Sequence, residues 1–146
     1  MSAINKETVS TQLHTVGDYL RFGASQFNKA ELFFGHGTDN AWDEATTLTM
    51  FALQLPHNLT AEILSCRLIE EEKFDLLSLF ERRVTEAIPV AYIINQATFA
   101  NLPFYVDERV LVPRSPIGEL IENRFQSIIE SEKPPKRILD LCTGSG

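Results

Sequence analysis

The first part of the chain carries apolar residues at helical spacing. Between about residues 7 and 29 they recur in steps of three and four, at Val9, Leu13, Val16, Leu20, Ala24 and Phe27. This spacing places them on one face of an amphipathic helix, so we expect a single helix over residues 7–29.

A loop is expected over residues 33–40, where glycines and small polar residues dominate. Asp39 or Asn40 can cap the helix that follows, and Asp43 lies near the positive end of that helix. The helical spacing predicts an inner face made of Trp42, Ala45, Leu48 and Ala52. Leu55-Pro56 is expected to end the helix, because proline disfavours a helical conformation in the residue before it.

Two further helices are expected, a short one over residues 60–68 and a longer one over about residues 70–87. The run Glu70–Glu72 suits the first turn of the longer helix, since carboxylates favour the positive end of the helix dipole. The predicted apolar face of that helix comprises Phe74, Leu77, Phe80, Val84 and Ile88. Residues 1–88 are therefore predicted to form a compact helical bundle that supports or recognises a partner.

The pattern changes at Ile88-Pro89, where β-branched and aromatic residues begin. Residues 90–94 predict an extended segment. Strands over residues 97–100 and 104–107, on either side of Asn101-Leu102-Pro103, predict a β-hairpin. We assign residues 89–116 to a hairpin linker, because the prolines near its end also disfavour a helix.

Residues 117–146 follow the order helix, loop, strand and glycine-bearing loop. The helix is marked by Ile117, Leu120, Ile121, Phe125, Ile128 and Ile129. A buried-type strand is expected over residues 138–141, and a small, glycine-containing loop follows it. This order is typical of the entry to a Rossmann-like sheet. The predicted fold class is therefore α+β, with a helical bundle, a hairpin linker and the first helix and strand of a Rossmann-like domain.

The formal charge of -7 narrows the class of partner. An acidic chain without a Lys/Arg cluster is poorly suited to phosphate backbones, so we expect no direct contact with nucleic acid. Basic proteins are better suited, because an acidic surface attracts them. We expect no membrane segment, since charges interrupt every apolar stretch, and the N-terminal residues lack a signal-peptide pattern. A cytoplasmic protein is the expectation.

Isolated cysteines and histidines give no indication of metal or nucleophilic chemistry. Cys66 and Cys142 lie far apart, with no Cys-x-x-Cys or Cys/His pair around them, so neither a zinc site nor a disulfide is expected. His36 lies between two glycines without a carboxylate or cysteine neighbour. A hydrogen-bonding role in the loop is expected for His36, rather than catalysis.

Several motifs in a fixed order resemble one protein family. Asp-x-x-x-Gly-x-Gly at residues 140–146 fits S-adenosylmethionine sites better than the dinucleotide fingerprint. Together with Pro89–Ile93, Phe104–Val106 and Val110–Arg114, it resembles the glutamine N(5)-methyltransferases that modify release factors and ribosomal proteins, over most of the chain. The segment Pro113-Arg114-Ser115-Pro116 and the loop Phe34–Asn40, with Trp42-Asp43-Glu44-Ala45 after it, resemble the branch that acts on the third protein of the large ribosomal subunit.

The resemblance implies an N-terminal fragment of an enzyme that uses S-adenosyl-L-methionine. Asp140, Thr143, Gly144 and Gly146 would lie along the methionine end of this cofactor, and Leu111 close to it. The substrate would be a glutamine side-chain amide of a basic ribosomal protein. The family holds that amide with an Asn-Pro-Pro-Tyr motif, which this sequence does not contain. No catalytic residue is therefore assigned, and the fragment is expected to be inactive by itself.

Three alternatives remain open at this stage. The chain could belong to a release-factor glutamine methyltransferase, to a non-catalytic helical binding module, or to a nicotinamide-dependent oxidoreductase with a similar glycine loop. A parallel-type strand at residues 138–141 needs neighbours on both sides. We therefore expect residues after about 117 to be loosely held in this fragment, while the bundle stays folded.

Overall fold

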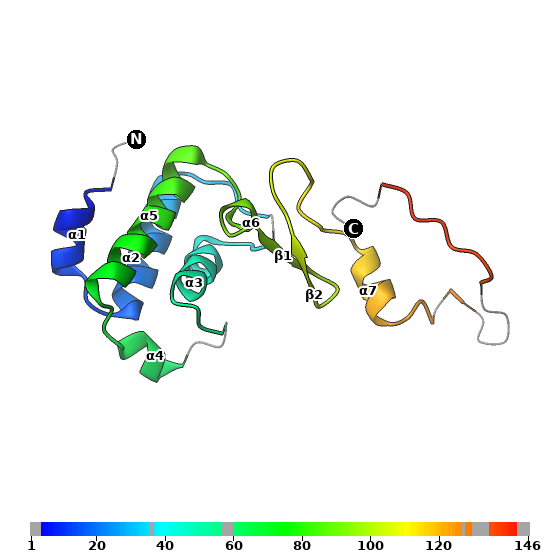
Figure 1. Ribbon diagram of the computed structural model, residues 1–146, viewed down its shortest axis with the longest axis horizontal. Helices are drawn as coiled ribbons and strands as arrows, with labels where there is room; N and C mark the ends of the chain where they lie inside the picture. The colour runs from blue at the N-terminus through cyan, green and yellow to red at the C-terminus, as the bar shows by residue number, and fades with distance from the viewer. Residues whose placement is uncertain (1–3, 36, 57–59, 127, 130–134, 143–146) are drawn as a thin grey trace. The chain divides into compact units, whose positions relative to one another are not determined.

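The computed structural model describes residues 4–35, 37–56, 60–126, 128–129 and 135–142. Over these residues the fold is α+β, with seven helices and one two-stranded antiparallel sheet (Figure 1). The chain divides into two compact units, one up to Ile94 and one from Asn95 onward. The α+β class expected from the sequence is confirmed at this level.

The first unit is a helical bundle built around the long helix α5. Its helices are α1 (Lys6–Gln12), α2 (Val16–Lys29), α3 (Ala41–Ala52), α4 (Ala61–Ser65), α5 (Glu70–Glu86) and α6 (Val90–Ile93). Helix α5 packs against α1, α2, α3 and α6, and α2 also packs against α3 and α4. The described residues of the expected loop, 33–35 and 37–40, are non-helical as predicted, and the helices expected near 60–68 and 70–87 are confirmed with shifted ends.

The single helix expected over residues 7–29 is wrong, because the chain breaks between α1 and α2. The break is a capping box: the Asp18 N–H donates to the Thr15 hydroxyl (3.2 Å), and the Thr15 N–H donates to the Asp18 carboxylate (2.9 Å). Backbone pairing adds to it, since Thr15 bridges to Arg67 and the Leu68 N–H donates to the His14 carbonyl (3.0 Å). The apolar period runs through the break and therefore does not reveal it.

The capping box predicts an acid-sensitive contribution to stability. Backbone N–H donation from Thr15, and then from His14, holds the pKa of Asp18 below its ordinary value of 3.8. A lowered folded-state pKa gives stability that is present above the unfolded pKa and is lost as pH falls through the folded pKa. Asp18→Ala should therefore lower the free energy of unfolding by about 0.3–1 kcal/mol near neutral pH, the range for an accessible carboxylate in the first turn of a helix. In urea titrations the difference from wild type should shrink below about pH 4, and a constant difference would contradict this assignment.

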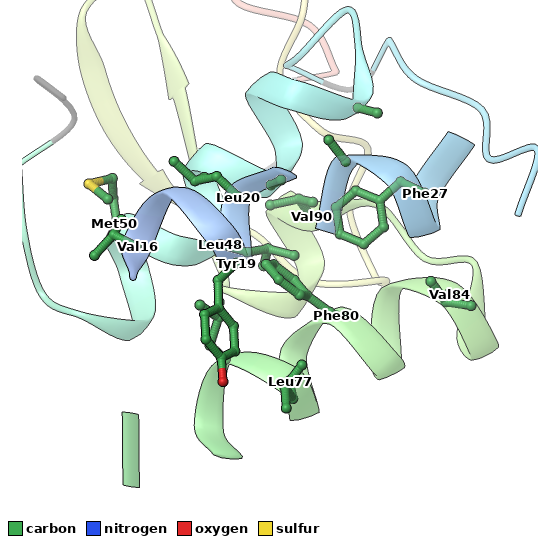
Figure 2. Packing of buried hydrophobic residues seen from close by; sticks show 14 of the residues in the cluster. Val16, Tyr19, Leu20, Phe27, Leu48, Met50, Leu77, Phe80, Val84 and Val90 are labelled. Atoms are coloured by element: carbon green, nitrogen blue, oxygen red, sulfur yellow. The ribbon is translucent and has the colours of Figure 1, made fainter. Parts of the chain in front are cut away.

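The bundle core gathers large side chains from α2, α3 and α5 (Figure 2). The Phe27 and Phe80 rings meet edge to face, with centroids 5.4 Å apart and planes at 87°. Gly23 on α2 allows this approach, because a β-carbon there would lie 2.6 Å from the Phe80 ring. Other core members with no solvent exposure are Tyr19, Leu20, Ala45, Leu48, Leu76 and Leu77.

The predicted inner faces are right in part. Asn40 is the N-cap of α3, Glu70–Glu72 form the first turn of α5, and Ala45 and Leu48 are buried as expected. Trp42 and Phe74, however, are 46% and 40% exposed. Both predictions of burial are wrong because charged residues take part of the inner face: α3 buries Glu44 and α5 buries Lys73 and Arg83.

The extended segment expected over residues 90–94 is also wrong. Val90–Ile93 form the short helix α6, which begins directly after Pro89, and its Val90 and Ile93 side chains join the bundle core. Strand preference reflects how a side chain fits its surroundings more than an intrinsic backbone rule. Here the side chains of Val90 and Ile93 pack into the bundle core, and this packing stabilises a helical turn.

The second unit opens with the predicted hairpin, which is confirmed with slightly earlier strands. β1 (Gln96–Phe99) pairs antiparallel with β2 (Leu102–Tyr105), so that Phe99 lies opposite Leu102. The two turn residues, Ala100 and Asn101, both have a positive φ, of 47° and 60°. Such a two-residue turn matches the twist of a hairpin.

Helix α7 (Ile117–Glu122) follows the hairpin and touches it within the same unit. The Asn101 side chain donates to the Glu122 carboxylate (2.9 Å), and the Phe99 ring lies against Gly118. The helix expected to reach Ile129 ends earlier, because Arg124 and Phe125 adopt positive φ values of 52° and 55°.

The strand expected over residues 138–141 does not form. Residues Ile138, Leu139 and Leu141 are exposed, and β1 and β2 make the only sheet within the described residues. A strand is stable only where a neighbour satisfies its backbone groups, and the described part of the second unit gives this segment none.

Candidate functional site

The residues assigned to cofactor binding belong to the second unit. Leu111 lies between the hairpin and α7 and is 70% exposed, and Asp140 is exposed in the last described segment. Thr143, Gly144 and Gly146 lie outside the described residues, as does His36 of the first unit. The structure therefore shows Leu111 and Asp140 as solvent-exposed, and it describes no other member of the candidate site.

A buried ion pair in the first unit was missed by the sequence reasoning. Arg83 of α5 donates to both carboxylate oxygens of Glu44 on α3, from Nε at 2.7 Å and from Nη2 at 3.1 Å. Each side chain is only 2% exposed. The sequence does carry a signal for this pair: Glu44 precedes Ala45 and Leu48, and Arg83 separates Phe80 from Val84, so opposite charges interrupt two apolar faces.

The Glu44–Arg83 pair holds the loop between α2 and α3. Nη2 of Arg83 also donates to the Phe33 carbonyl (3.0 Å), and the Thr38 hydroxyl donates to Glu44 (3.3 Å). Within the loop, the Gly35 N–H donates to the Thr38 carbonyl (2.7 Å). Burial strengthens such contacts and makes an unpaired partner costly, so the pair fixes the loop conformation.

Other buried polar groups serve the bundle itself. Lys73 donates to the Ser10 carbonyl (3.2 Å) and pairs with Glu70 (2.6 Å), which ties α1 to α5. The Tyr19 hydroxyl is buried without a hydrogen-bond partner among the described residues, and burial raises the pKa of Tyr19 to about 12. A phenol with so high a pKa stays protonated near neutral pH and is not suited to general-base chemistry.

The described part of the chain shows neither a cluster of metal-binding side chains nor a membrane-spanning helix. No group of three or more His, Cys, Asp or Glu side chains there could hold a metal ion. None of the helices seen in the structure has the length and apolar character of a membrane span.

Comparison with known proteins relates the chain to one kind of enzyme. No family model matches it. It is 51% identical over 135 residues, which are 92% of this chain, to a protein of Xanthomonas campestris named "Ribosomal protein uL3 glutamine methyltransferase". A protein of Xylella fastidiosa with the same name is 49% identical over 146 residues, the whole of this chain.

The chain spans about half the length of these relatives, since the matches cover 44% and 46% of them. An identity near 50% over so long a stretch goes well beyond a shared fold and covers both units. The resemblance indicated by the motifs is thereby confirmed: the chain is related, over about half of their length, to the proteins named ribosomal protein uL3 glutamine methyltransferase.

Proposed function

We propose that this chain contains the substrate-recognition domain and the first cofactor-binding segment of an S-adenosylmethionine-dependent methyltransferase. Its substrate is a glutamine side-chain amide on a basic protein of the large ribosomal subunit, modified in the cytoplasm. The observation that carries the proposal is the identity of about half to two proteins with this activity in their names. The acidic character of the chain supports a basic partner.

The proposed domain organisation assigns residues 1–88 to recognition, 89–116 to a hairpin linker and 117–146 to the start of a Rossmann-like domain. The division of the chain after Ile94 supports a separate helical domain. Because α6 packs on α3 and α5, the bundle takes a few residues that the sequence pattern gave to the linker.

The proposed cofactor site uses the chemistry of the final segment. S-adenosyl-L-methionine supplies a methyl group on a sulfonium and carries an ammonium and a carboxylate at its methionine end. The exposed Asp140 carboxylate fits the ammonium, because a charge-assisted hydrogen bond between them is strong. Backbone N–H groups of Thr143, Gly144 and Gly146 suit the carboxylate, and Leu111 offers an apolar contact.

The chemistry also requires a held amide. Its nitrogen is a poor nucleophile, because the lone pair is delocalised into the carbonyl. Positioning and hydrogen bonding must therefore lower the barrier. This sequence lacks the Asn-Pro-Pro-Tyr motif assigned to that task. We therefore infer that residues 1–146 alone bind and orient, and do not transfer a methyl group.

A chimaera tests the proposal. Residues 1–146 replace the matched segment of the Xylella fastidiosa relative, and the chimaera is incubated with methyl-labelled S-adenosylmethionine and ribosomal protein uL3. Label should enter uL3 with the chimaera and not with residues 1–146 alone. Asp140→Ala in the chimaera should weaken cofactor binding by roughly tenfold or more, as expected for the loss of a charge-assisted hydrogen bond.

Glu108→Ala is the matched control, because Glu108 is an exposed carboxylate of the same unit and has no assigned role. It should leave cofactor binding unchanged. A folded chimaera that binds uL3 but transfers no label would favour the non-catalytic binding module, which the self-contained core of the first unit makes the second candidate. Label entering a release factor instead of uL3 would favour the release-factor branch.

A further inference from the structure

In the loop between α2 and α3, which Glu44 and Arg83 hold in place, some residues make structural contacts and others are exposed. Asn40 caps α3 and exchanges hydrogen bonds with Asp43, while Thr38 and Gly35 close the loop. Asp39 of the loop and Trp42 of the first turn of α3 take no part in these contacts and are exposed. The same loop carries Phe33, whose side chain is also exposed although its carbonyl is held by Arg83.

The buried Glu44–Arg83 pair stabilises the loop at a cost in desolvation free energy. Apolar residues of similar volume would avoid that cost. In return the pair gives a fixed conformation to a loop that displays aromatic and acidic side chains. Trp42 is the only tryptophan of the chain, and aromatic side chains exposed on rigid backbone are typical of protein interfaces.

The loop and the first turn of α3 carry charge of one sign. Residues 30–44, which follow Lys29 at the end of α2, contain Glu31, Asp39, Asp43 and Glu44 and no Lys or Arg. Glu44 is neutralised by Arg83, and the others are exposed. A cationic partner meets attraction here, both from the carboxylates and from the aromatic faces, which bind Lys and Arg through cation–π contacts. A phosphate backbone or an anionic membrane would be repelled.

We propose that Phe33, Asp39 and Trp42, together with Asp43, form a docking surface for an extended cationic peptide segment. The Glu44–Arg83 pair acts on it as a positioning element. The inference rests on the proposed function only for the identity of the partner, which is then a basic segment of the ribosomal protein substrate. Recognition is thereby assigned to exposed residues of the loop and of the first turn of α3.

Binding is measured on the whole chain with a fluorescein-labelled peptide in which one glutamine is flanked by lysines and arginines. Anisotropy should report saturable binding that weakens as salt is raised. Trp42→Ala should weaken binding about three- to tenfold, the range of a cation–π contact at a partly exposed site, and Asp39→Asn about two- to fivefold. Trp42 fluorescence in the wild type should change along the same titration.

Matched controls lie on α5 of the same bundle. Phe74→Ala removes a similarly exposed aromatic ring, and Asp75→Asn removes the same charge, so both should change affinity less than twofold. Circular dichroism confirms that each variant is folded. The surface is refuted if the controls weaken binding as much as Trp42→Ala and Asp39→Asn do. It is also refuted if a glutamate-rich peptide or a single-stranded oligonucleotide binds as well.

The two proposals fail in distinguishable ways. If Trp42→Ala leaves peptide binding unchanged while the chimaera still methylates uL3, the docking surface is wrong and the proposed function stands. If the peptide binds at Trp42 but the chimaera transfers no methyl group, the surface stands as part of a binding module.

Discussion

Arg83→Met is expected to lower the free energy of unfolding by about 3–5 kcal/mol, because it leaves the Glu44 carboxylate buried without its partner. The substitution also removes the donor to the Phe33 carbonyl, so the loop before α3 should loosen. A loss of this size is a large fraction of the 5–15 kcal/mol typical of a folded protein. Urea unfolding followed by circular dichroism measures the loss, and fluorescence of Trp42, in the first turn of α3, reports on the region next to the loop.

Two further variants separate the buried pair from a general effect of charge. Arg82→Met removes the neighbouring arginine, whose pair with Glu86 is about half exposed, and should cost less than about 1 kcal/mol. The double variant Glu44→Leu/Arg83→Met should recover more than half of the loss, since no charge is then left unpaired. An equal cost for Arg82→Met and Arg83→Met would contradict the account of the pair.

Phe80→Ala is the second substitution with a large expected effect. The ring has no solvent exposure, meets Phe27 edge to face and packs directly on Gly23, which has no side chain to fill the space that the ring would leave. Removing it leaves a cavity among α2, α3 and α5, and such changes typically cost about 3–5 kcal/mol. Thermal and urea unfolding of the variant measure the loss.

Phe74→Ala on the same helix is the control. Its ring is 40% exposed, so its removal forfeits little buried area and should cost about 1 kcal/mol or less. An equal loss of unfolding free energy in Phe74→Ala and Phe80→Ala would contradict the observed packing. It would agree instead with the helical spacing, which predicts that both rings are buried on one face of α5.

The sequence pattern predicts most of the first unit because an apolar period is a direct signal of a buried helix face. It fails where another contact overrides it. The capping box of Thr15 and Asp18 interrupts one long period, and burial in the bundle core turns Val90–Ile93 into a helix. Neither effect is visible in the spacing of apolar residues.

The spacing of apolar residues also fails to predict the burial of charged side chains on the inner helix faces. A buried Glu44 is stable only because Arg83, 39 residues later in the chain, reaches it. Hydrophobic spacing treats each charge as solvent-facing, and it therefore put Trp42 inside in place of Glu44. Pairing between distant charged positions on two apolar faces is the signal that could have found it.

The residues of the candidate cofactor site are identified by sequence motifs, and their conformation cannot be predicted from local sequence alone. Asp140 and the glycines after it were assigned by order and resemblance, and the relatedness to uL3 glutamine methyltransferases supports that assignment as a proposal. The segment from Ile138 to Leu141, whose apolar side chains are exposed, does not form a strand by itself, because a parallel strand is stabilised by pairing with adjacent strands.

The most direct test of the central claim is the identity of the product made by the chimaera of residues 1–146 with its Xylella fastidiosa relative. After reaction with S-adenosylmethionine and uL3, mass spectrometry should find one added methyl group on a glutamine side-chain amide of uL3. A folded, cofactor-binding chimaera that leaves uL3 unmodified, or that methylates a different type of side chain, would contradict the account.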